Sequence, residues 1–439
     1  MTKASSSPVR PPTASTTKRI ATSQLKSGMF LVGVYQSWWK SPFFRHNRLL
    51  KSQKEVDLLL KSDVKEVMID PSRGLDVSEE LEGQSDESRA EAQQPEIDVV
   101  LGEDTPLREE DGPASSPLSP QVVSLKVKHD ALVSMERVFE GVKTGASIDH
   151  PKLQQTMQAL LEQVFAQEQA MAEVYLIQNL QQFDKTLYEH VVDVAILSVM
   201  VGIQLGLHEK ALEVLALGGL LHDVGHVRIP RNLLRRKYEL AEHEQVIFER
   251  HVDRGLAILE QCPAISSDVH RVVAEHHERQ DGSGYPSHRT ADELLVLSDI
   301  IGFVDQLDAL VSHWGPPPGL PTALAIRKLY LAAQNGKLRT ESVEALIRCL
   351  GVYPLGSLVS LSTGEWAVVI KINPFERLKP LVNIITDHEG NFNVLPFIED
   401  LAVSHPSGQE RVILDILNPI SEKVDVAKYF PRLHESPRR

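Results

Sequence analysis

Histidines and aspartates are the residues of this chain whose types and spacing could carry out chemistry. His222 and Asp223 are adjacent at the end of an apolar run, and His226 follows about one helical turn later. His276 and His277 form a second adjacent pair. A buried carboxylate costs free energy unless a partner compensates its charge, so we expect Asp223 to be paired. The other candidates in apolar helical contexts are His190, His251, Asp305 and Asp308.

Each of these residues, taken singly, has an ordinary explanation as a core or surface histidine or as a helix-capping aspartate. Taken together, imidazole and carboxylate groups suit first-row transition metals. Two metal ions about 3.5–4 Å apart are a standard device for hydrolysing phosphate esters. Asp223 could bridge two such ions, and His276 and His277, about 100° apart on a helix, could each serve a different one. The candidate ligands from residue type and context are His190, His222, Asp223, His251, His276, His277, Asp305 and Asp308.

The segment HHERQDGSGYP, residues 276–286, joins the second histidine pair to a glycine-rich loop. Its DG and SG dipeptides permit backbone turns with positive φ, and Pro286 stiffens the chain beside Tyr285. Such a loop beside a metal site lets a large substrate approach, so we predict that Gly284, Tyr285 and Pro286 bind substrate. The alternative is a plain turn that ends a helix, and the adjacent HHE favours the site.

The elements that must position these residues are helices. From Val122 to about Leu350 apolar residues recur every three or four positions, with breaks such as Gly206 and Pro230. The flanks differ: GMFLVGVY and VKEVMID are typical of strands, and from Gly351 onward YPLGSLVSLSTGEWAVVIKI alternates like strands. The predicted fold class is therefore mainly α, an all-helical central bundle with a small α+β N-terminal module and a small β-rich C-terminal module.

Composition divides the chain further. The stretch from Asp76 to Asp111 holds fourteen acidic and two basic residues, a net charge of -12 out of -14 for the whole chain. Low hydrophobicity with high charge is typical of a solvated linker. The predicted segments are residues 1–17, disordered; 18–76, the α+β module; 77–120, an acidic disordered linker; 121–350, the helical domain; and 351–439, the β-rich module and tail.

Charge and cysteine usage exclude several classes of protein. Outside the acidic stretch the net charge is only -2, the difference between -14 and -12, so nothing favours binding to duplex DNA. Cys262 and Cys349 form no metal-spaced pair and no disulfide framework, which suits a reducing compartment. We find no apolar run long enough to span a bilayer and no signal-peptide pattern. We expect a cytoplasmic protein without membrane insertion or a nucleic acid polymer as partner.

The two histidine motifs together resemble a known family. HD at 222–223 with HHExxDGxGYP at 276–286 is similar to the HD-GYP domain, a subgroup of the HD metal-dependent phosphohydrolases. The resemblance covers roughly residues 170–310, and LKSGMFLVGV and WWKSPF resemble an uncharacterised domain that often precedes HD-GYP domains. It implies an HD-type helical bundle and a bacterial phosphodiesterase that hydrolyses cyclic di-GMP.

The resemblance also implies roles for single residues. His190 matches the family's first metal histidine, the HD pair, His251 and the paired His276 and His277 match further ligands, and Asp305 matches the last metal carboxylate. These seven residues are the predicted metal ligands. Asp308 matches the aspartate of the family's DAL element. Family members hold two iron or manganese ions, or three when a glutamate stands four residues before the first histidine. Thr186 occupies that position here, which implies two ions.

Two departures from the family pattern concern the grip on phosphate. His226 replaces the lysine of HD-x-G-K, which in the family contacts the scissile phosphate. Trp314 stands at the position of a nucleotide-binding arginine, and prolines 316–318 replace the next contacts. The predicted metal ligands are retained, whereas the residues that contact phosphate and nucleotide in the family are replaced. Histidine can donate a proton near neutral pH, so His226 is our candidate substrate-binding contact to phosphate, or the general acid. The candidate catalytic residues are His226 and the bridging candidate Asp223.

Two main readings follow. The first is a dimetal phosphodiesterase that hydrolyses cyclic di-GMP to the linear dinucleotide or to GMP in bacterial second-messenger signalling. The alternative is a weak or inactive module that senses cyclic di-GMP and signals through partner proteins, diguanylate cyclase-type proteins among them. A third reading keeps the hydrolase and changes the substrate to another cyclic dinucleotide or a nucleotide phosphate. The helix from about Leu153 to Gln181 could pair with a second copy or pack on the helical domain.

Overall fold

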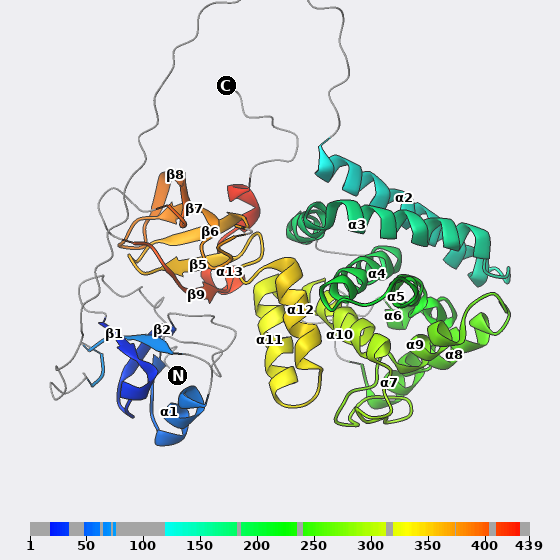
Figure 1. Ribbon diagram of the computed structural model, residues 1–439, viewed down its shortest axis with the longest axis horizontal. Helices are drawn as coiled ribbons and strands as arrows, with labels where there is room; N and C mark the ends of the chain where they lie inside the picture. Colours follow the sequence, from blue (N-terminus) through cyan, green and yellow to red (C-terminus); the bar gives the residue numbers. More distant parts are fainter. Residues whose placement is uncertain are drawn as a thin grey trace, which may run out of the picture.

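The computed structural model describes residues 18–34, 48–61, 65–71, 73–75, 119–181, 186–234, 240–312, 319–373, 375–403 and 410–430. Within them the chain forms a helical domain and two small antiparallel sheets (Figure 1), which confirms the predicted fold class. Residues 1–17, most of the acidic linker, the segment WWKSPF and residues 313–318 lie outside the described residues. The predictions about disorder, about Trp314 and about the three prolines are therefore not addressed by the structure.

The helical domain is built from helices that share one hydrophobic core. Its two longest helices, α2 and α3, pack against each other and cover α4 and α5 (Figure 1). The helices are α2 (Pro120–Lys143), α3 (His150–Gln181), α4 (Leu187–Gln204), α5 (Glu209–Leu221), η3 (Val224–Arg228), α6 (Arg231–Leu234), α7 (Glu242–Glu249), α8 (His251–Leu259), α9 (Ser267–Glu275), α10 (Val296–Val311), α11 (Thr322–Gln334) and α12 (Thr340–Leu350).

Helix α4 lies at the centre of this domain. Thr186 caps it: the Thr186 Oγ1 accepts from the backbone N–H of Glu189, and the Glu189 carboxylate accepts from the N–H of Thr186 at 2.7 Å. Contrary to our expectation from the sequence, α4 is long and apolar enough to cross a membrane by length and composition alone. In this structure 72% of that window is buried by neighbouring helices, and its Asp193 forms a buried ion pair with Lys128.

The N-terminal sheet contains β1 (Lys18–Ala21), β2 (Phe30–Val34), β3 (Arg48–Leu49) and β4 (Glu66–Ile69). The strands are antiparallel in the order β1-β4-β2-β3, and α1 (Gln53–Leu60) follows β3. The predicted strands GMFLVGVY and VKEVMID correspond to β2 and β4, and α1 is the helix of the predicted α+β module. Leu31 of β2 lies opposite Ile69 of β4, so both side chains face the same side of the sheet. Both are buried in the core.

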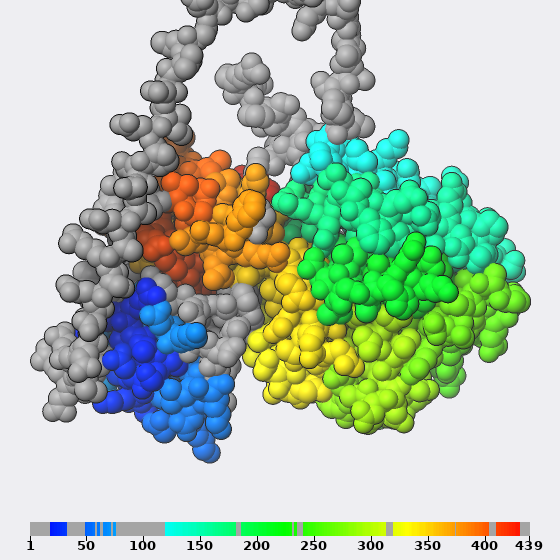
Figure 2. Space-filling view, viewed as in Figure 1, coloured from blue at the N-terminus to red at the C-terminus, as the bar shows by residue number. Residues whose placement is uncertain are grey.

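The C-terminal sheet has five strands in the order β8-β7-β6-β5-β9. Phe30, Val32 and Met68 of the N-terminal sheet form a small apolar cluster with Leu414 of β9. Figure 2 shows the two sheet modules side by side, with the helical domain forming the rest of the molecule. The elements of the module are β5 (Leu358–Leu361), β6 (Trp366–Lys371), β7 (Leu381–Thr386), β8 (Phe392–Asp400), β9 (Ile413–Leu417), α13 (Pro419–Glu422) and η4 (Val426–Tyr429).

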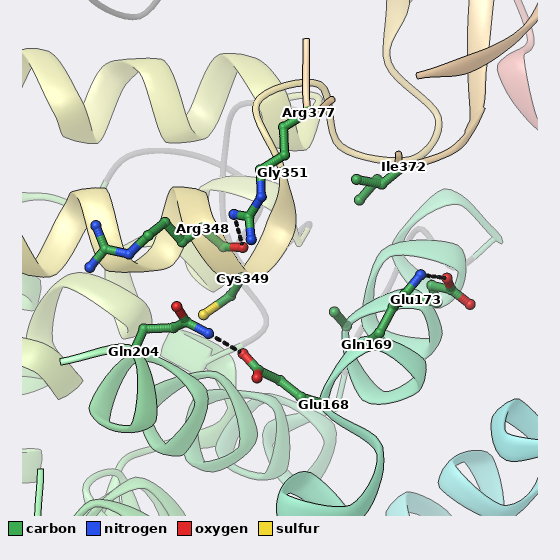
Figure 3. Close-up of a pocket in the computed structure, with 10 residues that line it drawn as sticks. Glu168, Gln169, Glu173, Gln204, Arg348, Cys349, Gly351, Ile372 and Arg377 are labelled. Atoms are coloured by element: carbon green, nitrogen blue, oxygen red, sulfur yellow. Dashed lines mark hydrogen bonds between the residues drawn. The ribbon is translucent and has the colours of Figure 1, made fainter. Parts of the chain in front are cut away.

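A small cavity of about 140 Å³ lies where the helical domain meets the C-terminal module (Figure 3). The Arg377 guanidinium, from the loop after β6, donates to the backbone carbonyl of Arg348 near the end of α12 at 2.6 Å. Gln204 at the end of α4 donates to Glu168 of α3 at 2.9 Å. The first contact joins the C-terminal module to α12, and the second joins α4 to α3 beside it. None of the predicted metal ligands lines this cavity.

Candidate metal centre

The structure brings all seven predicted metal ligands together in two adjacent groups. Asp223, His251, His276 and His277 form the first group, and His190, His222 and Asp305 form the second. Within each group the potential ligand atoms lie within 4.8 Å of one another. The ligands come from α4, the end of α5, α8, the end of α9 and α10, so helices far apart in the sequence are needed to assemble the centre.

Asp223 lies between the two groups. Its Oδ1 is 3.4 Å from the Nε2 of His251, which belongs to the first group. Its Oδ2 is 3.5 Å from the Nε2 of His222 and 3.6 Å from that of His190, which belong to the second. Each oxygen of one carboxylate thus faces a different group, which is the arrangement of a carboxylate that bridges two cations. This geometry fits the bridging role expected from the sequence.

Three of the histidines are oriented by the same kind of hydrogen bond to the backbone. The Nδ1 of His222, His251 and His276 lies 2.8–2.9 Å from the backbone carbonyl three residues earlier, on Gly219, Phe248 and Val273. A carbonyl can only accept, so each Nδ1 must carry the proton and each Nε2 must present its lone pair. Histidine ligands in proteins are commonly fixed in this way. Helix ends supply these carbonyls, because the last turn of a helix leaves carbonyls without intrahelical partners.

His190 is held by a carboxylate instead. Its Nδ1 is 2.8 Å from the Oδ2 of the fully buried Asp308, and its Nε2 is 3.2 Å from the Oδ1 of Asp305. Burial alone would lower the pKa of His190, but the hydrogen bonds to Asp305 and Asp308 raise it to about 10. Without a metal, His190 is therefore a cation between two carboxylates. Asp308 positions His190, a role that the sequence indicated only through the family's DAL element.

The chemistry of the donor set fits divalent transition metals. The Nε2 atoms of His251 and His276 are 3.3 Å apart, and those of His251 and His277 are 3.1 Å apart. Burial lowers the pKa of His251 and His277 well below the usual value and that of His222 to about 4, so all three are neutral at pH 7. Neutral imidazole lone pairs that converge beside a carboxylate bind such a cation.

The geometry groups the adjacent histidine pair together instead of dividing it between two ions. His276 and His277 both belong to the first group. Helix α9 ends at Glu275, so His276 is its C-cap and His277 lies in the following turn. The 100° spacing of helical neighbours therefore does not apply to this pair. Instead, His277 turns its ring toward the glycine-rich loop and stacks on Tyr285, with ring centroids 4.5 Å apart.

His226 lies beside the centre rather than at a distance from it. Its Nε2 is 3.3 Å from the Oδ1 of Asp223, and its ring stacks on His251 with centroids 4.2 Å apart. The side chain is 2% exposed. Gly225 permits this approach, because a Cβ there would lie 1.9 Å from the backbone oxygen of His251. The structure thus places our second candidate catalytic residue against the Asp223 carboxylate.

The glycine-rich loop is tied to the centre by a carboxylate that the sequence reasoning overlooked. The buried Glu278 accepts from the backbone N–H groups of Ser287 at 2.6 Å and of Arg289 at 3.0 Å. Its place in the HHE motif was the available signal. Gly282 has a positive φ of 74°, as expected, but Gly284 does not. Gly284 is needed for space instead, because a Cβ there would lie 2.4 Å from the Cα of Glu278.

A helical bundle with two groups of histidines and aspartates around a shared carboxylate defines an HD-type metal-dependent phosphohydrolase. A match to the HD domain family covers residues 164–338, and a match to a domain of unknown function, DUF3391, covers residues 17–178. The chain is 30% identical over 376 residues to the cyclic di-GMP phosphodiesterase PA4108 of Pseudomonas aeruginosa, which covers 84% of each protein. The chain belongs to the HD-GYP group of HD-domain phosphodiesterases, with DUF3391 at its N-terminal side.

Other relatives match over shorter stretches. The cyclic di-GMP phosphodiesterase response regulator RpfG of Xanthomonas campestris is 33% identical over 153 residues, which are 34% of this chain and 39% of that protein. A 3′3′-cGAMP-specific phosphodiesterase 2 of Vibrio cholerae is 35% identical over 106 residues, or 24% of this chain and 20% of that protein. Bd1817, an HDG"Y"P protein of Bdellovibrio bacteriovorus, matches in structure with a TM-score of 0.45 at 18% identity, covering 75% of this chain and 98% of that one.

Proposed function

We propose that this protein hydrolyses cyclic di-GMP, first to the linear dinucleotide and then to GMP. The observation that carries the proposal is the position of Asp223, whose two carboxylate oxygens face two separate groups of histidine nitrogens. These nitrogens are neutral or, in His190, carry a proton that a metal ion can displace. A single structural cation would not require this divided arrangement. The similarity to PA4108 over 84% of each protein supports the same reaction.

A bound pair of divalent ions would polarise the phosphodiester and lower the pKa of a water molecule. The side chains of this protein would position the donor atoms, donate a proton and bind the nucleotide. The carbonyl-held histidines and the Asp308–His190 pair fix the donor atoms in advance, so no reorganisation is needed during the reaction. His226, against Asp223, is positioned to donate a proton to the departing 3′-oxygen. Tyr285 and its neighbours Gly284 and Pro286 border the open groove beside the centre and would seat the nucleotide.

A second candidate function is a sensor that binds cyclic di-GMP and hydrolyses it slowly. The buried, stacked ring of His226 favours it, because a histidine held against His251 reaches less far than the lysine that it replaces. In that case the bound nucleotide would act through a signalling partner, such as a diguanylate cyclase-type protein, in the cytoplasm.

Turnover of cyclic di-GMP tests the proposal. The protein would be purified anaerobically, and its bound iron and manganese counted in the same sample, with Asp223→Ala as the matched control. Two metals per chain with turnover that is lost in the control would support the phosphodiesterase. Two metals with nucleotide binding but no turnover would favour the sensor. His226→Lys then separates the two cases further, because a gain of turnover would show that His226 limits the reaction.

A further inference from the structure

An open groove of about 360 Å³ lies next to the metal centre. One wall is a single face of α7 and the start of α8, which includes Val246, Glu249 and Asp253. The opposite wall is the glycine-rich loop, including Tyr285. His251, two residues after Glu249, belongs to the first metal group, and Tyr285 stacks on His277 of the same group. The groove therefore adjoins the centre on both of its walls.

The charges of the groove fit a nucleobase better than a phosphate. Glu249 and Asp253 place two carboxylates on one wall, against one guanidinium from Arg250. A phosphate there would meet net negative charge, whereas the metal centre would attract it. Val246 is 51% exposed and offers apolar surface on which a planar ring can pack. The volume is near the lower end of the range for small-molecule sites, roughly 300–1,000 Å³, which suits one nucleoside unit of a dinucleotide.

We propose that Glu249 selects guanine, and so makes this protein specific for guanine-containing cyclic dinucleotides; the inference rests on the proposed function. Glu249 is half-buried at the end of α7, and Gln245 donates to its Oε1 at 3.0 Å, which orients the carboxylate. Within the described part of the chain its Oε2 has no hydrogen-bond partner. Glu249 and Tyr285 line the same groove, so a base that packs beside the Tyr285 ring can reach the carboxylate.

The chemistry of the two purines explains the selection. Guanine presents two adjacent donors, N1–H and N2–H, on the edge that pairs with cytosine, and a carboxylate offers two acceptors with matching spacing. Adenine presents an acceptor at N1 beside its N6 donor, so its N1 would face a carboxylate oxygen without a hydrogen. The similar proteins differ in this respect, since two are named as acting on cyclic di-GMP and another as 3′3′-cGAMP-specific. The metal ligands alone cannot distinguish the bases.

The test compares Glu249→Gln with wild-type full-length protein loaded with manganese. For each, kcat/KM is measured with cyclic di-GMP and with cyclic di-AMP, and slowly hydrolysed phosphorothioate analogues of both are titrated to obtain Kd. An amide offers one donor and one acceptor, which matches adenine, so the preference for the guanine dinucleotide should fall by roughly tenfold or more in both ratios. Glu242→Gln, an exposed change on the same helix outside the groove, should leave both ratios unchanged.

The outcomes separate this inference from the proposed function. If wild-type protein turns over cyclic di-GMP but Glu249→Gln keeps the same base preference, the assignment of Glu249 is overturned and the phosphodiesterase stands. A change of preference in Asp253→Asn instead of Glu249→Gln also overturns it. If wild-type protein hydrolyses neither dinucleotide, the proposed function fails, and the ratio of the two Kd values decides the role of Glu249 by itself.

Discussion

Replacement of Gly302 by alanine sets two physical effects of opposite sign against each other. Gly302 lies inside α10, where alanine is favoured over glycine by about 1 kcal/mol. A Cβ at this position, however, would lie 2.1 Å from the backbone oxygen of His276. A separation of at least 3.0 Å is normal for such a pair, so the end of α9 must move by about 0.9 Å. Overpacking of this kind costs about 1–3 kcal/mol, which cancels or exceeds the gain in helix propensity.

The displaced segment carries His276 and His277, so the metal centre should suffer more than the fold. Misplacement of catalytic groups by about 1 Å can lower a rate roughly 100-fold. We expect Gly302→Ala to stay folded, to bind less metal and to lose about two orders of magnitude in kcat. Metal counting, thermal unfolding and turnover of cyclic di-GMP on one sample measure all three.

Gly141→Ala is the matched control for this prediction. Gly141 also lies inside a long helix, α2, but its Cβ would meet only the Cβ of Ala146, at an ordinary 3.8 Å. This variant should be as stable as wild type or more stable by up to about 1 kcal/mol, with an unchanged metal content. Full metal content and full turnover in Gly302→Ala would refute the argument that the close approach of α10 to His276 sets the geometry of the centre.

Three further predictions concern the ligands themselves. Asp308→Asn should weaken metal binding by about 10- to 100-fold, because His190 loses the charged partner on its Nδ1; competition with a chelator measures this, and unchanged affinity would contradict the positioning role. Since the pKa of His190 is about 10 without metal, a metal ion must displace its proton, so affinity should rise about tenfold per pH unit between pH 7 and 9; a flat profile in the same titration would count against it. Burial lowers the pKa of His222 to about 4, below its unfolded value near 6.5, so the metal-free protein binds fewer protons when folded than when unfolded. Its free energy of unfolding should therefore fall as the pH drops from about 6.5 toward 4. Denaturant titrations at several pH values test this.

Much of the architecture was predictable because local patterns and tertiary packing agree. The apolar run before His222 ends as a helix at Leu221, where the sequence placed it. The alternating stretch from Gly351 onward does form strands, with STGE connecting β5 to β6 and HEGN connecting β7 to β8. The pairing of β5 with β9 was not predictable, because it joins strands that are separated by three others in the sequence. Periodicity reports which face of a strand is buried but not which strand lies beside it.

The residues of the candidate site could be predicted from the sequence, but the contacts that orient and group them could not. Residue types, spacing and the resemblance to the family identified the seven predicted metal ligands, which the structure brings together. The carbonyls of Gly219, Phe248 and Val273 that orient three of them are backbone groups, which no residue type reveals. The grouping of His276 with His277 depended on where α9 ends, and helix ends are uncertain by one or two residues in any pattern. The domain boundaries, the identity of the metals and the catalytic roles remain predictions.

The contact between the two sheets has a consequence for synthesis of the chain. Phe30, Val32 and Met68 are covered by Leu414, which lies about 350 residues further along the chain than Met68. At roughly 5–20 residues per second, a ribosome needs about 20–70 s to make that intervening stretch. For that interval the apolar side of the N-terminal sheet has no β9 to cover it. The nascent chain therefore presents an early surface for chaperones, and truncation before β9 should leave this sheet prone to aggregation.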